Sequence, residues 1–302
     1  MLSYKSGLQK CIKSVKTESP FAFSKNTTYG LGGYAEIAFL PETVYEAKLA
    51  FDRLSSEHSA FEVLGNGSNV LVADDGFDGA VICTKNLRGI IRLDCNRLMC
   101  LAGTKVAELL AYCKKHGLGG LEYLYGIPAT IGGAAYMNAG VCGAAIGDNI
   151  ESVCVYDGKT HILSREMCDF RYRHSTMRDI NALILSIIVK VDECAALEID
   201  KRLTFFKQRR RHLPKGKSCG CVFKNPKGYS AGYLIDAAGL KGTRCGGAHV
   251  SREHASFIIN DGGSSQDVKR LIETVKSKVF VQFGIELQEE VVYIGDFNDF
   301  NG

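Results

Sequence analysis

The chain has 302 residues, of which 46% are hydrophobic and 23% charged, and its formal net charge is +4. This length suits two or three domains with a substantial buried core. The charge is too small to indicate nucleic-acid binding by itself, although it suits a small anionic substrate. No run approaches the ~20 apolar residues of a membrane helix, so we expect neither nucleic acid nor membrane as a partner.

The N-terminus and the cysteines indicate the compartment. The opening residues, MLSYKSGLQKCIKS, lack the apolar centre of a signal peptide, so we expect a cytoplasmic protein. The twelve cysteines lie mostly in apolar runs, as is typical of small buried side chains in a reducing environment. Cys219 and Cys221 are too close for the usual metal-binding pair, and no histidine cluster completes a zinc site, so we predict no metal.

The first predicted helix covers residues 42–55, with an apolar face formed by Val44, Ala47, Phe51 and Leu54. Residues 63–82 then read as strand, turn and strand. The turn, Gly65-Asn66-Gly67-Ser68-Asn69, has the residue types of a concave nest of N–H donors for a pyrophosphate. An ordinary Asn-Gly hairpin is the alternative for this stretch alone. The spacing matches neither the dinucleotide fingerprint nor a P-loop.

A second helix is predicted to start at Thr104, as N-cap, and to end at Gly117, as a left-handed cap. Further strands are expected at residues 61–65, 79–84, 97–103, 151–157, 160–164 and 182–191. Because strands and helices do not alternate along the chain, the pattern favours an α+β fold.

Residues 126–140, GIPATIGGAAYMNAG, are the most informative stretch of the chain. Glycine permits positive φ and lets backbone N–H groups approach a large ligand closely. Asn138 adds a side-chain amide that could orient the ligand. A tightly packed glycine-rich turn is the alternative.

The last third begins with a charged helix, predicted over residues 199–211, and a loop signal at residues 214–217. The basic cluster at the end of this helix, residues 207–211, suits a solvated helix end or a phosphate contact. Strands are expected at residues 221–225 and 255–260. Helices are expected at 233–239 and at 265–283, the latter with Ser265 as N-cap and Gly284 beyond its end.

Further blocks accompany the two glycine-rich stretches, at residues 26–41 (NTTYGLGGYAEIAFLP), 172–175 (YRHS), 220–226 (GCVFKNP), 231–242 (AGYLIDAAGLKG), 246–260 (GGAHVSREHASFIIN) and 283–295 (FGIELQEEVVYIG). In this order they resemble the UDP-N-acetylenolpyruvoylglucosamine reductase (MurB) family over nearly the whole chain. The resemblance implies a two-part FAD-binding domain of the vanillyl-alcohol-oxidase (PCMH) type, followed by an α+β substrate-binding domain. It also implies FAD and NADPH as cofactors, and hydride transfer to the enolpyruvyl group of a UDP-sugar, giving UDP-N-acetylmuramate for peptidoglycan synthesis.

On this basis we expect an FAD-binding domain over residues 1–195, with lobes of about 1–85 and 86–195. A substrate-binding domain would cover residues 196–302, and its last strand is a candidate to return to the first lobe. No insert separates the helix at 199–211 from GCVFKNP, which resembles the shorter type II branch. We expect a monomer. Two alternatives stay open: another FAD-dependent oxidase of the same fold, and a catalytically disabled flavin-binding regulator.

The resemblance places three catalytic residues. The family's proton-donating serine falls on Cys221. A thiol, with a reference pKa of about 8.5, is a stronger acid than an alcohol. The family arginine falls on Arg173, whose guanidinium suits a carboxylate that becomes an enediolate; Arg171 is the weaker candidate. The family glutamate falls on Glu290, and strand alternation would point Glu289 to the opposite face.

The remaining site residues are expected to bind cofactor or substrate. The expected FAD contacts are Gly65, Asn66, Gly67, Ser68, Asn69, Gly126, Pro128, Ile131, Gly132, Gly133, Ala134, Asn138, Ala139 and Gly140. The expected contacts to the sugar or diphosphate are Lys224, Asn225, Lys241 and Arg244.

Overall fold

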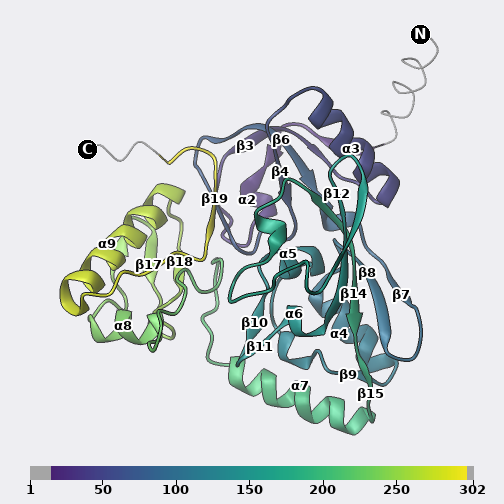
Figure 1. The fold of residues 1–302 in the computed structure, drawn as a ribbon. Helices are drawn as coiled ribbons and strands as arrows, with labels where there is room; N and C mark the ends of the chain where they lie inside the picture. Colours follow the sequence, from purple (N-terminus) through teal and green to yellow (C-terminus); the bar gives the residue numbers. More distant parts are fainter. Residues whose placement is uncertain (1–14, 298–302) are drawn as a thin grey trace. The chain divides into compact units, whose positions relative to one another are not determined.

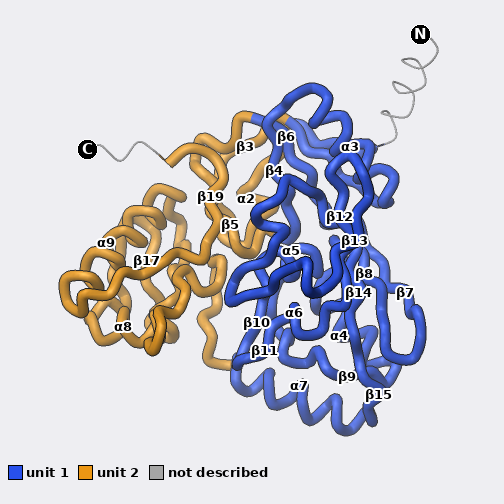
Figure 2. The backbone as a smooth tube through the Cα atoms, in the orientation of Figure 1, with its two compact units in different colours: residues 1–19, 37–66, 79–210 blue, residues 20–36, 67–78, 211–302 orange. Residues whose placement is uncertain are grey.

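The computed structural model describes residues 15–297, which form two compact units (Figure 2). Of the described residues, unit 1 comprises 15–19, 37–66 and 79–210, and unit 2 comprises 20–36, 67–78 and 211–297. Each unit contains a hydrophobic core of its own. No described helix is long and apolar enough to cross a membrane.

The main sheet of unit 1 is antiparallel, with the strand order β13 (Thr160–Ser164), β12 (Ile150–Tyr156), β14 (Leu183–Lys190), β8 (Arg97–Leu101) and β7 (Ile90–Arg92) (Figure 1). The central strand β14 shows why the sequence forms this sheet. Its alternate residues Leu183, Leu185, Ile187 and Val189 are at most 1% exposed. Side chains two apart lie on one face of a strand, so this period directs one face of β14 into the core.

A second sheet follows the strand order β1 (Thr17–Glu18), β3 (Tyr34–Phe39), β6 (Gly76–Cys83) and β4 (Phe61–Leu64), and β2 (Phe21–Ala22) also pairs with β3. Helix α3 (Val44–Ser56) lies between β3 and β4 in the chain and confirms the helix predicted at 42–55. Thr43 caps it, because its hydroxyl accepts from the Glu46 N–H while the Glu46 carboxylate accepts from the Thr43 N–H.

Helix α4 (Val106–Lys115) starts one residue later than predicted. Lys105 is its N-cap, and the prediction of Thr104 is wrong because the Thr104 hydroxyl instead exchanges hydrogen bonds with the backbone of Gly89. Gly117 follows the helix with a φ of 66°, as predicted for a left-handed cap.

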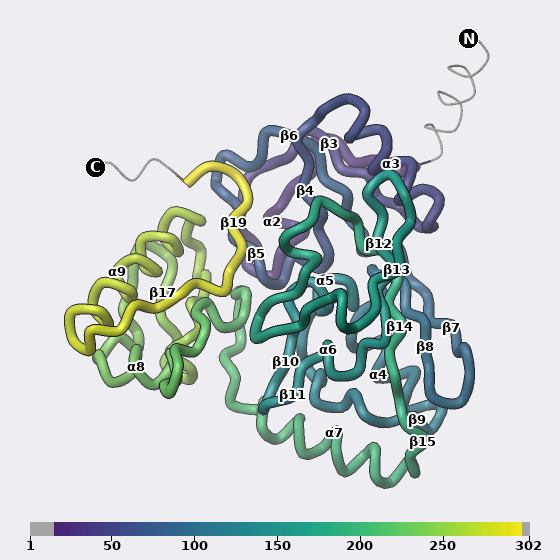
Figure 3. Tube along the Cα trace, in the orientation of Figure 1, coloured from purple at the N-terminus to yellow at the C-terminus, as the bar shows by residue number. Residues whose placement is uncertain are grey.

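The strand–turn–strand segment is not a hairpin. Strand β4 pairs in parallel with β6, whereas β5 (Val70–Val72) pairs in parallel with β19 (Val292–Ile294), so the two strands that flank residues 65–69 have different partners (Figure 3). If β4 and β5 had paired with each other, residues 65–69 would be an ordinary hairpin turn. The turn is therefore free to have another role.

The glycine-rich stretch is partly helical. Residues Ile131–Tyr136 form α5, capped by the Thr130 hydroxyl, which accepts from the Gly133 N–H. Helix α5 lies against β14 and β8 of the main sheet. The chain continues through the hairpin of β10 (Gly140–Val141) and β11 (Ala144–Ala145) into α6 (Ile146–Asn149). Residues 126–140 are therefore part loop and part helix, and α5 provides the helical part.

Unit 1 ends with the short pair of β9 (Leu118–Gly119) and β15 (Asp192–Glu193), followed by α7 (Ala196–Arg210). Helix α7 begins three residues before the predicted start at 199. Short 3₁₀ turns lie at Thr84–Asn86, Glu122–Leu124 and Thr176–Arg178.

Unit 2 contains the short helix α2 (Phe23–Asn26) and an antiparallel sheet of β16 (Arg244–Cys245), β17 (Ala248–Val250) and β18 (Ile258–Asn260). It also contains α8 (Ala231–Ala237) and α9 (Ser265–Phe283), and α9 lies against β16 and β17 (Figure 1). Ser264, not Ser265, caps α9, because its hydroxyl accepts from the Asp267 N–H. Gly284 ends the helix in the left-handed conformation.

Candidate active site

Cys221 lies on an extended segment that hydrogen bonds on both sides. The Val222 N–H donates to the Ser256 carbonyl at 2.8 Å, and the Lys224 N–H donates to the Gln288 carbonyl at 2.8 Å. Gly220, with a φ of 84°, turns the chain into this segment. The predicted strand at 221–225 is therefore reduced to isolated bridges, and these still fix the backbone that carries Cys221.

The structure brings Cys221 and Glu290 together in unit 2. The Glu290 N–H donates to the carbonyl of Val222, the residue after Cys221, at 2.7 Å. Burial, with smaller contributions from the nearby Cys221 and Glu290, raises the pKa of Cys219 to about 12. Cys219 is buried and stays a neutral thiol, whereas Cys221 is only half-buried. Cys221 is therefore the accessible thiol of the pair.

The two adjacent glutamates have different surroundings. Lys276 donates to the Glu289 carboxylate at 2.6 Å, and the hydroxyl of Tyr293 donates to its other oxygen. Burial raises the pKa of Glu289, but these hydrogen bonds and the charges of Lys269 and Lys276 together outweigh burial and hold the pKa below its usual value. Glu289 is thus committed to a structural ion pair, and the assignment of Glu290 as the catalytic glutamate stays a prediction.

Arg173 lies in unit 1, on the turn after Phe170. Its φ of 54° is in the left-handed region, which is uncommon for a residue with a side chain and which marks a strained, often functional, position. The guanidinium donates to the Gly140 carbonyl at 3.1 Å, at the end of the glycine-rich stretch. Arg171 instead pairs with Asp169 at 2.6 Å and is exposed, which supports Arg173 as the candidate.

Asn138 holds the turn that presents Arg173. Its Nδ2 donates to the Arg171 carbonyl at 2.8 Å, and its Oδ1 accepts from the Gly147 N–H at 3.0 Å. The side chain is 5% exposed. Both ends of this amide are thus used within unit 1, which gives Asn138 a structural role, and its role in orienting a flavin stays a prediction.

The turn at residues 65–69 fits a pyrophosphate. Within residues 15–297, the backbone N–H groups of Gly67, Ser68 and Asn69 donate to no protein acceptor. Gly67 has a φ of 62°, and consecutive N–H groups around such a residue form an anion-binding concavity. Three unused donors in a row suit an anionic group such as a diphosphate.

Several predicted flavin-contacting glycines also serve packing within unit 1. A Cβ on Gly65 would lie 2.5 Å from the Thr130 hydroxyl, and one on Gly132 would lie 2.9 Å from the Ala102 Cβ. A Cβ on Gly140 would lie 2.2 Å from the Ala144 carbonyl oxygen. The packed-turn alternative therefore explains part of the glycine content of this stretch.

The four residues predicted to contact the substrate lie in unit 2 and differ in their present partners. The Asn225 Oδ1 accepts from the N–H of Ala231, the first residue of α8. Lys241 pairs with Asp236 at 2.6 Å, and Arg244 pairs with Asp261 at 3.5 Å. The Lys224 ammonium makes no ion pair within residues 15–297, so it is the cation most available to a substrate.

A cavity of about 170 Å³ in unit 2 is lined by Gly242, Arg244, His249, Arg252 and Glu253. Of the lining residues, Arg244 is paired with Asp261 at 3.5 Å, and Glu253 contributes a carboxylate to the wall. No described group of histidine, cysteine or acidic residues is placed to hold a metal ion.

Sequence reasoning missed two contacts around the glycine-rich stretch. Thr130 caps α5 and meets Gly65, and its place three residues before Gly133 is the capping signal that would have found it. Arg210 donates to the Gly126 carbonyl at 3.1 Å, so one member of the basic cluster supports this stretch.

Comparison with known proteins places these features in a family. Residues 35–164 match the family described as FAD binding domain, and residues 211–294 match the C-terminal domain of UDP-N-acetylenolpyruvoylglucosamine reductase. The UDP-N-acetylenolpyruvoylglucosamine reductase of Moorella thermoacetica is 39% identical over 286 residues, covering 93% of this chain and 94% of that protein. That of Clostridium botulinum strain Hall is 35% identical over 280 residues, covering 91% of each.

A crystal structure of UDP-N-acetylenolpyruvylglucosamine reductase (MurB) from Thermus caldophilus is 36% identical, with a TM-score of 0.78, and the match covers 93% of this chain and 99% of that chain. These matches confirm a PCMH-type FAD-binding domain followed by the family's C-terminal domain, and they confirm FAD as a cofactor. The chain belongs to the UDP-N-acetylenolpyruvoylglucosamine reductase family.

Proposed function

We propose that this flavoprotein reduces the enolpyruvyl group of UDP-N-acetylglucosamine enolpyruvate, with NADPH as reductant, and so forms UDP-N-acetylmuramate for peptidoglycan. Similarity at 39% identity over 93% of the chain carries this conclusion. When bound, FAD supplies the hydride transfer between NADPH and the substrate double bond. The unused N–H groups of Gly67, Ser68 and Asn69 would hold its diphosphate.

The chain's own residues would manage charge and protons. Addition of hydride to one carbon of the enolpyruvyl group leaves its neighbour, alpha to the carboxylate, in need of a proton. We assign that proton to the Cys221 thiol, because it is half-buried and lies on a fixed backbone segment to which the Glu290 N–H donates at Val222. Arg173 would balance the enediolate through its planar guanidinium. Glu290 would be the second proton-exchanging group.

Substrate binding would rest first on Lys224, whose ammonium makes no ion pair within the described residues and suits a diphosphate. Asn225, Lys241 and Arg244 would contribute after exchange of their present partners. We further propose that the chain belongs to the type II branch and acts as a cytoplasmic monomer.

The test is a mixture of purified protein, NADPH and UDP-N-acetylglucosamine enolpyruvate, followed at 340 nm. We expect a yellow protein that releases non-covalent FAD on denaturation, and NADPH oxidation that requires the UDP-sugar. A flavin-loaded protein that oxidises NADPH at the same rate with and without the UDP-sugar would contradict the proposal and favour another flavin enzyme. No NADPH oxidation at all would favour a regulator.

A further inference from the structure

The turn before β5 contains two asparagines whose amides have different partners. Asn66 donates from Nδ2 to the Pro128 carbonyl at 2.7 Å, within unit 1. Asn69 donates from Nδ2 to the Glu290 carbonyl at 3.0 Å, within unit 2. The sequence assigns both residues to the cofactor, but only Asn69 reaches a candidate catalytic residue.

The Asn69 amide continues the pairing of β5 and β19 by one residue. Strands β5 and β19 pair in parallel from Val70 and Val292 onward (Figure 3). One step earlier, the Asn69 carbonyl accepts from the Val292 N–H at 3.0 Å. The chain before Asn69 then turns away, and the Asn69 side-chain amide donates to the Glu290 carbonyl at this step. Asparagine side chains often make such hydrogen bonds to the backbone beside a turn.

The Glu290 backbone is consequently held from two directions. Its N–H donates to the Val222 carbonyl at 2.7 Å, and its carbonyl accepts from Asn69. On the other side, Lys276 and Tyr293 hold the Glu289 carboxylate. The backbone that carries the Glu290 side chain is therefore fixed by hydrogen bonds at its N–H and at its carbonyl, and the first of these joins it to the Cys221 segment.

We infer that Asn69 is a positioning residue, which fixes Glu290 relative to Cys221 for the proton-transfer step. The inference rests on the proposed role of Glu290. It explains why an amide is needed at position 69: a carboxylate of the same shape cannot donate to a carbonyl, and alanine cannot reach it. It leaves the Asn69 N–H available to the cofactor.

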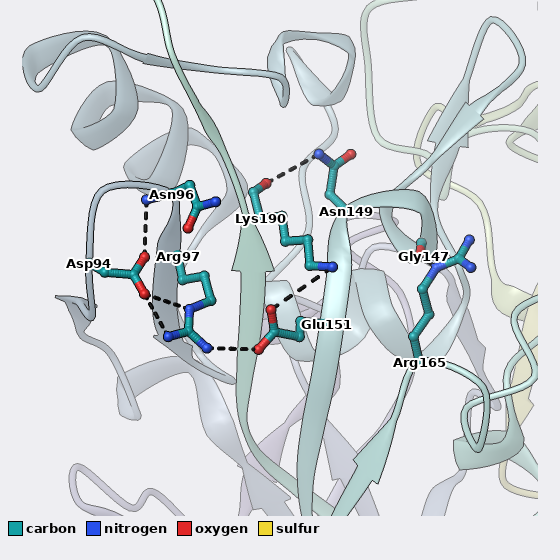
Figure 4. Close-up of polar contacts among 8 residues, drawn as sticks. All are labelled: Asp94, Asn96, Arg97, Gly147, Asn149, Glu151, Arg165 and Lys190. Carbon is teal, nitrogen blue, oxygen red and sulfur yellow. Dashed lines mark hydrogen bonds and ion pairs between the residues drawn. The ribbon is translucent and has the colours of Figure 1, made fainter.

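The test compares Asn69→Ala and Asn69→Asp with Asn149→Ala in the FAD-loaded, full-length protein. Asn149 is a matched control, because its Nδ2 also donates to a backbone carbonyl, that of Lys190, at 3.2 Å (Figure 4). The first readout is hydrogen–deuterium exchange of the peptide covering residues 287–294. Both Asn69 variants should exchange there about tenfold faster, and Asn149→Ala should not.

The second readout is stopped-flow absorbance of the flavin. Both Asn69 variants should slow reoxidation by UDP-N-acetylglucosamine enolpyruvate about 10- to 100-fold, because a small displacement of a catalytic group is costly, and should change its pH profile. Reduction by NADPH should change less than about threefold. Asn149→Ala should leave both rates as in the parent.

Three results would overturn the inference. Unchanged exchange at residues 287–294 would show that Asn69 does not hold Glu290, whatever the reaction. Equal losses in both half-reactions would show a general structural or cofactor role. Parent-like reoxidation by Asn69→Asp would show that donation is not required. A parent protein that is never reoxidised by the UDP-sugar would instead contradict the proposed function, and the exchange measurement would still decide whether Asn69 holds Glu290.

Discussion

Replacement of Gly67 by alanine should strongly destabilise unit 2 at the turn that we propose holds the FAD diphosphate. Gly67 has a φ of 62°, and the left-handed conformation costs a residue with a side chain about 1–2 kcal/mol. Reduced freedom of the unfolded chain returns about 0.4–1 kcal/mol of this. The new Cβ would also lie 2.5 Å from the Asn26 carbonyl oxygen and 2.8 Å from the Thr27 Cα. Both are backbone atoms that cannot rotate away, and overpacking of this kind adds about 1–3 kcal/mol. The expected loss is about 2–4 kcal/mol.

The control variant Gly228→Ala separates the cost of the left-handed backbone from the cost of the steric overlap of the new Cβ. Gly228 lies in the same unit and has a φ of 82°, and no atom lies within 4 Å of an added Cβ. Gly228→Ala should therefore lower the free energy of unfolding by only about 1 kcal/mol. Urea unfolding of the apoprotein can be followed by tyrosine fluorescence, since the chain has 13 tyrosines and no tryptophan. If Gly67→Ala is within about 0.5 kcal/mol of Gly228→Ala, the close approach of Gly67 to Asn26 and Thr27 is not rigid and the reasoning fails.

Three further predictions concern residues of the site. Arg173→Lys should fold and be reduced by NADPH nearly as the parent is, yet lose most of its reoxidation rate, because lysine keeps the charge without the planar fork; equal losses in stopped-flow traces of both half-reactions would make Arg173 structural. Glu289 has a pKa held below its usual value, so the stability it adds is present above about pH 4.5 and is lost as pH falls through the lower folded-state pKa. The urea midpoint of Glu289→Gln should therefore fall less between about pH 5 and 3 than that of the parent. If the two proteins lose stability equally over this range, the Glu289 carboxylate is not the source of the acid sensitivity. Iodoacetamide should inactivate the parent but not Cys221→Ser, and bound UDP-sugar should slow the parent's inactivation; equal loss in Cys221→Ser would assign it to another thiol.

The sequence predicted the regular elements well where period and caps agree. The face of α3 and the left-handed Gly117 follow directly from local spacing and are confirmed. The predicted start of α4 was wrong because the Thr104 hydroxyl hydrogen bonds to the Gly89 backbone and does not cap the helix. That hydrogen bond joins distant residues, and local pattern does not contain it.

The candidate site shows the same limit. Motifs named Cys221, Glu290 and Arg173, and the choice of Glu290 over Glu289 is supported by the partners of Glu289. The long-range roles of Asn69 and Asn138 were not predictable, because each amide bonds a carbonyl far along the chain. Glycine content alone also could not separate residues that approach a ligand from those, such as Gly132, that approach the protein itself.

The most direct test of the account is the protonation step at Cys221. Stopped-flow reoxidation of the reduced flavin by UDP-N-acetylglucosamine enolpyruvate should be measured across pH for the parent, Cys221→Ser and Cys221→Ala. The donor must be the neutral thiol, so the parent rate should fall at alkaline pH. Cys221→Ser should remain active without that alkaline fall, because a serine hydroxyl does not titrate there. Cys221→Ala should block reoxidation and leave reduction by NADPH intact. If Cys221→Ala is reoxidised as fast as the parent, Cys221 is not the proton donor.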